Sequence, residues 1–451
     1  MSFSGDRAPG GKRRIFRHPA QVVVFSFAAA IAIGTALLML PMSRAGEGSA
    51  PFITALFTAT SCVCVTGLAT VDPATYFTPF GQAVMVGLIQ VGGFGIMTMA
   101  SLLALFISRR MGLRTRLTAA AETKSVGIGD VRRVLRGVFA ITVTVEACVA
   151  LALTLRFATD RPLATAIWQG VFHAVSSFNN AGFALFSDNL IGYAGDPFVL
   201  IPISLAIIIG GIGFPVIMEL LRRTRPRHWS LHTRMTLLMT AVLLIGGTVF
   251  MGWSEWSNPA TMGGFGIGDK IDLAFFHSVQ PRTAGFAAWD YGKATDETIM
   301  GTILLMFVGG GSAGTAGGLK VTTFLLLFFV IVAEVRGEPH VTAFDRRINP
   351  RVTRQALTVA LLGVAAVVGA TMALTEVTDL PLREVMFEAT SAFGTVGLSM
   401  GITGKLNVPG QLIIIGLMFL GRLGPITLIS ALALRETHRH YTLPEGAPLI
   451  G

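Results

Sequence analysis

Four segments of the chain share one pattern: FTATSCVCVTG at residues 57–67, FHAVSSFNNAG at 172–182, FHSVQPRTAG at 276–285 and FEATSAFGTVG at 387–397. Each segment begins with phenylalanine, continues through small and polar residues and ends with glycine, and the third is one residue shorter. The closing glycines recur at intervals of 103 to 115 residues. This spacing over the whole chain indicates one ancestral unit of about 110 residues, repeated four times.

The composition predicts that the chain lies in a lipid bilayer. Of its 451 residues, 52% are hydrophobic and 13% are charged. Soluble domains carry about 25% charged residues, so a soluble chain is excluded. With this many apolar side chains, some must face lipid as well as each other. We therefore expect a membrane protein that crosses the bilayer several times.

Apolar stretches of two lengths alternate around the repeated segments. Eight are long enough to cross a bilayer core of about 30 Å: 20–41, 81–108, 134–155, 196–221, 235–253, 297–335, 355–375 and 409–434. Four shorter ones lie between the members of each pair: 51–64, 163–178, 270–280 and 381–393. They are too short to span and predict re-entrant half-helices.

The predicted fold is an all-α integral membrane protein. Four units of helix, re-entrant pore half-helix and helix surround one ion pore in a pseudo-fourfold arrangement with eight spans. We place the units at residues 1–110, 111–228, 229–345 and 346–451, the last with a cytoplasmic tail.

The positive charge of the chain is concentrated on one side of this arrangement. The formal net charge is +10, and 25 of the 35 Lys and Arg residues fall in five segments: those before residue 20, at 109–136, 222–234 and 336–354, and after 434. Positive charge marks cytoplasmic segments. We therefore expect a multi-pass protein of the cytoplasmic membrane with both termini inside, and we assign the charge to topology rather than to nucleic-acid binding.

Irregular backbone at membrane depth is tolerated where it lines water or is buried in protein. Four loops around one axis would present rings of carbonyl oxygens, with the partially negative C-terminal ends of the half-helices aimed at the centre. Such a site favours a weakly hydrated monovalent cation, and glycine permits the backbone geometry that turns carbonyls inward. The four loops therefore predict a potassium pathway with no covalent chemistry and no catalytic residue.

The segments VTGL at 65–68, NNAGF at 179–183, RTAGF at 282–286 and GTVGL at 394–398 resemble the filter segments of the Trk/Ktr/HKT superfamily of potassium transporters. Eight spans with no extra helical pair are more similar to its KtrB type than to the longer TrkH type. The resemblance implies a K⁺ selectivity filter whose backbone carbonyls hold the ion at these residues: Val65, Thr66, Gly67, Asn180, Ala181, Gly182, Thr283, Ala284, Gly285, Thr395, Val396 and Gly397.

The same resemblance implies the assembly. It predicts a homodimer in the lipid bilayer with one pore per protomer, bound on the cytoplasmic side by a ring of KtrA/TrkA-like subunits. The regulatory nucleotide is expected on that partner rather than on this chain, which carries no covalently bound cofactor. Na⁺ is a candidate activator.

A glycine-rich run interrupts the sixth apolar stretch. Each glycine costs a helix about 1 kcal/mol relative to alanine, so we expect a break there. The run departs from the phosphate-binding loop pattern, because Leu319 separates its last glycine from lysine. The resemblance implies a gate formed by Gly309, Gly310, Gly311, Ser312, Ala313, Gly314, Thr315, Ala316, Gly317, Gly318 and Lys320.

Arg422, within the last span, completes the predicted gate. A charge inside a membrane is costly and marks a functional residue by default. The position of Arg422 matches the arginine that faces the gating loop in the superfamily. Its guanidinium could hold loop carbonyls and place a positive barrier in the cation path. The glycines at 92–95 and 210–213, at equivalent places in other repeats, favour close packing or bending.

Other polar residues leave two questions open. Asp72, Asp188 and Asp290 follow three filter glycines and are expected at the outer mouth, where carboxylates concentrate cations, although they could be ordinary loop residues. His173, His277 and Glu388 share one repeat position. They either hydrogen-bond the filter loops from behind or couple transport to H⁺ or Na⁺. Glu146, in the third span, is expected to have a donor partner that the sequence does not identify.

These observations predict a channel-like subunit for K⁺ uptake, gated by the glycine-rich loop and by a cytosolic partner. The alternative on the same scaffold is a Na⁺/K⁺ or H⁺/K⁺ symporter. A membrane enzyme that uses His173 and His277 on a lipid is disfavoured, because both histidines occupy one position of a repeated re-entrant segment.

Overall fold

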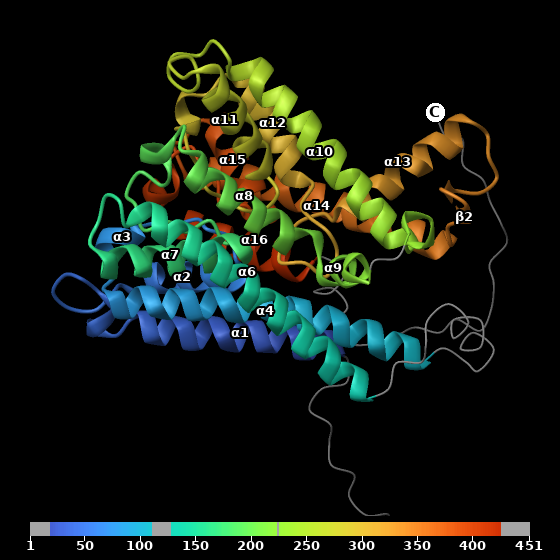
Figure 1. The fold of residues 1–451 in the computed structure, drawn as a ribbon, viewed down its shortest axis with the longest axis horizontal. Helices are drawn as coiled ribbons and strands as arrows, with labels where there is room; N and C mark the ends of the chain where they lie inside the picture. Colours follow the sequence, from blue (N-terminus) through green and yellow to red (C-terminus); the bar gives the residue numbers. More distant parts are fainter. Residues whose placement is uncertain (1–18, 111–127, 223–224, 425–451) are drawn as a thin grey trace, which may run out of the picture.

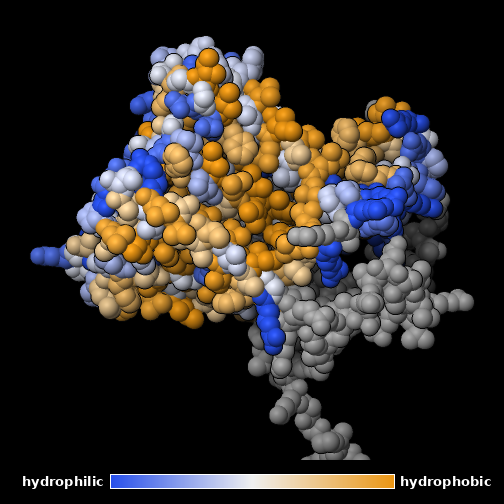
Figure 2. All heavy atoms as spheres, viewed as in Figure 1, coloured by the Kyte–Doolittle hydropathy of each residue, from blue (hydrophilic) through white to orange (hydrophobic). Residues whose placement is uncertain are grey.

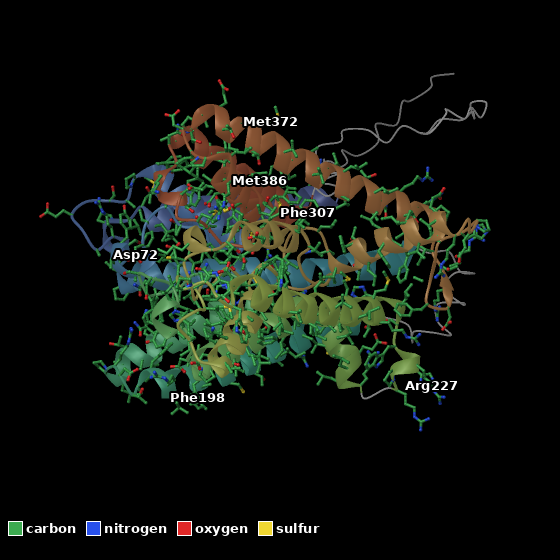
Figure 3. The ribbon with its side chains drawn as sticks, turned by 90° about the horizontal axis from the view of Figure 1, so that it is seen from above. Asp72, Phe198, Arg227, Phe307, Met372 and Met386 are labelled. Atoms are coloured by element: carbon green, nitrogen blue, oxygen red, sulfur yellow. The ribbon has the colours of Figure 1, made fainter. Side chains whose placement is uncertain are left out.

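The computed structural model describes residues 19–110, 128–222 and 225–424. The helices α1 (Pro19–Leu38) and α4 (Pro79–Arg110) run along the longest axis of the molecule, whereas α6 (Ile128–Phe157) and α10 (Leu231–Glu255) run obliquely to it (Figure 1). Asp72 lies at one end of this axis and Arg227 at the other, whereas Phe198 and Met372 project from opposite sides (Figure 3). Hydrophobic side chains cover the middle of the face seen in Figure 2, and hydrophilic ones gather toward the two ends. This distribution is that of a membrane protein.

The helices follow the predicted order of long, short and long in each quarter of the chain. The first repeat contains α1 (Pro19–Leu38), α2 (Phe52–Cys64), α3 (Pro73–Tyr76) and α4 (Pro79–Arg110). The second contains α6 (Ile128–Phe157), α7 (Leu163–Phe178), α8 (Pro197–Ile212) and α9 (Phe214–Leu221). The third contains α10 (Leu231–Glu255), α11 (Ile267–Val279), α12 (Asp296–Phe307) and α13 (Val321–Val335). The fourth contains α14 (Pro350–Val377), α15 (Leu382–Gly394) and α16 (Val408–Leu423).

Short elements connect these helices. The 3₁₀ turns are η1 (Pro41–Ser43), η2 (Ile191–Tyr193), η3 (Pro226–His228), η4 (Tyr291–Lys293) and η5 (Thr403–Lys405). Strands β1 (Thr342–Ala343) and β2 (Arg346–Arg347) pair antiparallel, with Thr342 opposite Arg347. The predicted unit boundary at 345/346 falls inside this hairpin, and the boundaries themselves remain predictions.

The first long helix of each repeat is continuous and faces outward. The segments Gln21–Leu38, Leu135–Phe157, Leu231–Glu255 and Pro350–Val377 are each long and apolar enough to cross a membrane, and their apolar windows are only 22% to 33% buried. Ile245 and Val249 of α10 are each 67% exposed, and Met372 of α14 is 70% exposed. Such side chains face lipid, because water would penalise so much exposed apolar surface.

The second long helix of a repeat lies further inside and is interrupted in repeats 2 and 3. Helices α8 and α9 meet at an angle of 98° at Gly213, whose φ is 100°. Helices α12 and α13 are separated by the loop 308–320, so the break predicted in the sixth span is confirmed. Helix α16 ends at Leu423 and is followed by Gly424 with φ 81°, and residues 425–434 of the predicted eighth span lie outside the described residues.

The four half-helices are α2, α7, α11 and α15, with 13, 16, 13 and 13 residues. At 1.5 Å per residue they are too short to cross a bilayer, as predicted. The phenylalanine that opens each repeated segment is fully buried, at Phe57, Phe172, Phe276 and Phe387. Each half-helix is therefore anchored inside the protein by the phenylalanine of its repeated segment. Its C-terminal end leads into the loop that closes the same segment.

Candidate functional site

The four loops after the half-helices adopt one backbone conformation. Each begins with a non-glycine residue in the left-handed region: Val65 at φ 55°, Asn180 at 59°, Thr283 at 66° and Thr395 at 50°. Two residues later each reaches a glycine with positive φ: Gly67 at 95°, Gly182 at 69°, Gly285 at 81° and Gly397 at 95°. Left-handed φ is rare for β-branched residues and persists where surrounding structure enforces it. The same three-residue turn is therefore enforced in all four repeats.

Residues at the end of each half-helix hold these turns. The backbone N–H of the middle residue donates to a half-helix carbonyl at 2.7 to 3.0 Å: Thr66 to Ser61, Ala181 to Ser176, Ala284 to Gln280 and Val396 to Ser391. The hydroxyls of Ser61 and Ser391 also accept the N–H of Gly67 and Gly397 at 3.1 Å. The Gln280 side chain accepts from Phe286 N–H at 3.0 Å, and the Ser176 hydroxyl donates to the Phe183 carbonyl at 2.8 Å.

The four turns close into a ring in chain order. A Cβ atom added to any of the four predicted filter glycines would lie 2.1 to 2.5 Å from a carbonyl oxygen of the next repeat: Gly67 from Ala181, Gly182 from Ala284, Gly285 from Val396 and Gly397 from Thr66. A real Cβ does not fit at this distance, so glycine is required. The contact of Gly397 with Thr66 joins the last repeat to the first, so the four turns form a closed ring.

The predicted outer-mouth aspartates lie at cavities above this ring. Asp188 and Asp290 line a cavity of about 400 Å³ together with Gly67, Gly285 and Gly397. Asp72 lines a neighbouring cavity of about 260 Å³ with Gly67 and Gly182. Each carboxylate also accepts a local backbone N–H, from Ala74, Gly192 and Gly292. Their effect on ions remains a prediction, and their role in holding the loops is visible in these bonds.

His173, His277 and Glu388 contact the loops from behind. Nε2 of His173 accepts from Leu185 N–H at 3.3 Å, and Nε2 of His277 accepts from Ala288 N–H at 3.2 Å. Both donors lie three residues after a filter glycine. Glu388 accepts from the hydroxyl of Ser399 at 2.7 Å and from that of Thr403. All three side chains are fully buried, and these contacts favour the supporting role over the coupling role.

The glycine-rich loop packs between α8 and the lower face of the ring. Gly311 N–H and Thr315 N–H donate to the carbonyls of Gly211 and Gly210 at 2.8 and 3.1 Å. These carbonyls belong to the last turn of α8 and lack helical partners because the helix ends at Ile212. A Cβ on Gly317 would lie 2.0 Å from the Thr395 hydroxyl, so the loop touches the predicted filter segment of repeat 4 directly.

Two basic side chains reach the carbonyls of this loop. The guanidinium of Arg422 donates to the Thr315 carbonyl and, at 2.9 Å, to the Gly92 carbonyl on α4. The Lys320 ammonium donates to the Ala316 carbonyl at 2.5 Å and to that of Gly317 at 3.3 Å. Arg422 is 3% exposed, so it does not extend to the membrane surface. The structure thus brings the predicted arginine and the predicted loop together, and gating by them remains a prediction.

Glycines of the second long helices allow this close approach. A Cβ would lie 1.9 to 2.1 Å from the carbonyl of the residue four positions before a filter glycine in three repeats: Gly92 from Val63, Gly210 from Phe178 and Gly421 from Phe393. The interpretation of the glycine clusters at 92–95 and 210–213 as packing and bending sites is confirmed.

Three features of the site were missed or left incomplete by the sequence. The supporting roles of Ser61, Ser176, Gln280 and Ser391 were missed, although they share the fifth position of the repeated pattern, which was the available signal. The hydrogen bond from Thr315 to Asn180, at 2.9 Å, has no sequence signal. Glu146 contacts Asn179 Nδ2 at 3.1 Å and Gln90 Nε2 at 3.4 Å, which confirms its expected donor partner.

Known proteins match this chain over nearly its full length. Residues 6–438 match the TrkH family, described as cation transport protein. The chain is 40% identical over 437 residues to Ktr system potassium uptake protein B of Bacillus subtilis, covering 96% of this chain and 97% of that protein. It is 36% identical to the protein of the same name from Vibrio alginolyticus, covering 99% and 96% of the two. It is 35% identical to potassium/sodium uptake protein NtpJ of Enterococcus hirae, covering 98% and 99%.

A solved structure has the same fold. The crystal structure of the potassium transporter TrkH from Vibrio parahaemolyticus matches with a TM-score of 0.74 at 16% identity, covering 94% of this chain and 86% of that one. This match confirms the predicted helical multi-span fold. The matched family consists of cation transport proteins rather than enzymes. Because the family match and the similarity to these relatives both extend over most of its length, the chain belongs to the TrkH family of cation transport proteins.

Proposed function

We propose that this protein is the K⁺-translocating membrane subunit of a potassium uptake system and conducts K⁺ as a channel does. The observation that carries the proposal is the closed ring of glycine–carbonyl contacts, in which Gly67, Gly182, Gly285 and Gly397 each abut the following repeat. Rings of backbone carbonyls replace the hydration shell of K⁺. The names of the relatives from Bacillus subtilis and Vibrio alginolyticus, which are potassium uptake proteins, support the same substrate.

The charge distribution around the ring supports a cation. The half-helices α2, α7, α11 and α15 end next to it, and the C-terminal end of a helix carries a partial negative charge of about half an elementary charge. Asp188 and Asp290 line the cavity above it. Four dipoles and nearby carboxylates lower the free energy of a monovalent cation inside the ring. None of the twelve proposed filter residues has a basic side chain that would oppose this effect.

We further propose that the loop 309–320 and Arg422 gate this pathway. The loop lies against the filter segment of repeat 4 through Gly317 and Thr395, so it occupies the space below the ring. Arg422 holds its carbonyl at Thr315. Movement of the loop requires that these hydrogen bonds break. The strength of these bonds would therefore set how often the loop leaves its docked position.

The assembly and orientation belong to the same proposal. A homodimer with a cytosolic nucleotide-binding ring is what the resemblance implies, and the names of the relatives that belong to a Ktr system support the presence of partner proteins. Arg227, which belongs to the basic segment 222–234, lies at the end of the molecule opposite to Asp72 (Figure 3). Since positive segments stay inside, this end faces the cytoplasm, and we place both termini there.

Coupled transport with Na⁺ is the second candidate, favoured by the potassium/sodium name of the Enterococcus hirae relative. The test is ion flux into liposomes containing the purified protein, under K⁺ and Na⁺ gradients applied separately. We expect K⁺ flux without Na⁺ and a reversal potential that follows K⁺ alone. K⁺ flux that requires Na⁺ on the same side would select the symporter, and absence of both K⁺ flux and K⁺ binding would reject the potassium function.

A further inference from the structure

The side chain of Asn180 bridges the glycine-rich loop and two filter segments. Its Oδ1 accepts a hydrogen bond from the Thr315 hydroxyl at 2.9 Å, and its Nδ2 donates to the Arg282 carbonyl at 3.2 Å. Arg282 directly precedes Thr283, the first residue of the filter turn of repeat 3. Because a backbone carbonyl only accepts, the amide nitrogen must face Arg282 and the amide oxygen must face Thr315. One amide therefore joins the loop, repeat 2 and repeat 3.

The bridge lies in a fully enclosed part of the protein. Asn180 is 1% exposed and Thr315 is 0% exposed. Asn180 also has a left-handed backbone, at φ 59°, which asparagine tolerates better than most residues. In a buried setting an amide that loses a partner pays the cost of an unsatisfied polar group. The hydrogen bond from the Thr315 hydroxyl therefore helps to fix the orientation of the Asn180 amide, and its loss would leave the amide oxygen without this partner.

The Thr315 hydroxyl lies within hydrogen-bond distance of Asn180 only when the loop is docked. Its N–H donates to the Gly210 carbonyl at 3.1 Å, and its own carbonyl accepts from Arg422. Its hydroxyl makes a second, longer contact with the Phe178 carbonyl at 3.3 Å. Any displacement of the loop that opens a path below the ring removes the Thr315 hydroxyl from Asn180.

The loop touches the corresponding residues of repeats 3 and 4 without such a bridge. A Cβ on Gly309 would lie 3.2 Å from the Thr283 methyl carbon, and one on Gly317 would lie 2.0 Å from the Thr395 hydroxyl. Within the described residues, the hydroxyls of Thr283 and Thr395 have no hydrogen-bond partner. Asn180 is therefore the filter residue whose side chain is hydrogen-bonded to the loop.

We propose that Asn180 is a positioning residue that couples the loop to ion selectivity, an inference that rests on the proposed potassium function. With the loop docked, Thr315 fixes the Asn180 amide, and the amide fixes the Arg282 carbonyl at the base of the repeat 3 filter turn. When the loop withdraws, the amide is free to rotate and the filter turn of repeat 3 loosens. Selectivity for K⁺ over Na⁺ then depends on the hydroxyl of a loop residue that lies outside the filter.

The test measures the K⁺/Na⁺ permeability ratio from reversal potentials in liposomes, because this ratio does not depend on how often the pathway is open. Thr315→Val removes the hydroxyl and keeps the shape, and we expect the ratio to fall about threefold to tenfold, as for the loss of one buried hydrogen bond. Thr315→Ser keeps a hydroxyl at this position and should keep the wild-type ratio. Thr371→Val on α14, which removes a buried hydroxyl that donates to the Val367 carbonyl of its own helix, is the matched control and should keep the wild-type ratio.

A double substitution tests the path of the coupling. Asn180→Gly suits the left-handed backbone and removes the amide, and it should lower the ratio. The combination of Asn180→Gly with Thr315→Val should then equal Asn180→Gly alone, because both changes break one path. Multiplied effects would overturn the coupling, as would a Thr315→Val variant with altered flux but an unchanged ratio, which would make the loop a simple plug. A wild-type protein without K⁺ selectivity would instead reject the proposed function itself.

Discussion

The guanidinium of Arg422 donates a hydrogen bond to the carbonyl oxygen of Thr315, 107 positions earlier in the chain. A second hydrogen bond, of 2.9 Å, connects the same guanidinium to the Gly92 carbonyl on α4. One side chain of repeat 4 thereby ties the glycine-rich loop of repeat 3 to the second long helix of repeat 1. The loop is held from the side as well as by the end of α8.

Replacing Arg422 by alanine should raise basal K⁺ flux without the cytosolic partner. The change removes two charge-assisted hydrogen bonds, each worth about 1.5 to 3 kcal/mol, and the positive charge below the ring. Loss of about 1.4 kcal/mol of loop-docking free energy alone shifts the open population about tenfold. Flux into liposomes measures the effect, and Arg354→Ala on the exposed surface of α14 is the control. Unchanged flux, in this variant and in one with a shortened loop, would remove the loop from gating.

Substituting Gly67 by serine should abolish discrimination between K⁺ and Na⁺. A Cβ at this position would lie 2.3 Å from the Ala181 carbonyl, so the ring must open on that side. We expect Na⁺ flux to approach K⁺ flux when the two gradients are applied separately. Gly369→Ser on α14, where an added Cβ meets nothing within 4 Å, should behave like the wild type. A Gly67→Ser protein that remains K⁺-selective is incompatible with the ring as the filter.

Neutralising Asp290 should weaken uptake at low K⁺ concentration. Its carboxylate lines the cavity above the ring, and Lys293 offsets part of its charge at 3.7 Å. We expect Asp290→Asn to raise the KM for K⁺ about twofold at low ionic strength and less at high ionic strength, since salt screens over about 8 Å at 0.15 M. Asp345→Asn, in the loop between β1 and β2, is the matched control. A KM shift of equal size at every ionic strength would indicate a structural effect of Asp290 instead.

K⁺ flux should be independent of pH between about 6 and 8, without accompanying H⁺ movement. Nε2 of His173 and of His277 accepts a backbone N–H, from Leu185 and Ala288. A second proton on either ring would place two N–H groups against each other in a buried site, which is costly. A pH-sensitive dye inside the liposomes measures proton entry. Acidification that scales with K⁺ uptake would make the histidines coupling groups.

Much of the fold could be predicted because its signals are local. The lengths of the apolar stretches separated long helices from half-helices: the half-helix predicted at 163–178 matches α7, and that at 51–64 differs from α2 by one residue. Glycine density predicted the break between α12 and α13.

Less of the site could be predicted, because its partners come from other repeats. The sequence identified Arg422 and Glu146 as charges that need partners inside a membrane, but the carbonyl of Thr315 and the side chains of Gln90 and Asn179 carry no signal of that role. The glycine cluster at 210–213 predicted close packing or bending, and the structure shows a bend of 98° at Gly213, where an added Cβ would lie 2.5 Å from the Ser312 carbonyl of the loop.

The sequence by itself determined that this is a fourfold-repeated membrane protein with a glycine in each loop, because repeat spacing, apolar length and residue type are properties of the chain alone. The tertiary structure decided which neighbour each glycine faces, which carbonyls Arg422 holds and that Asn180 joins the glycine-rich loop to the Arg282 carbonyl of repeat 3. The physical reason is that a buried polar group must find a partner, and that partner is set by which distant segments pack together.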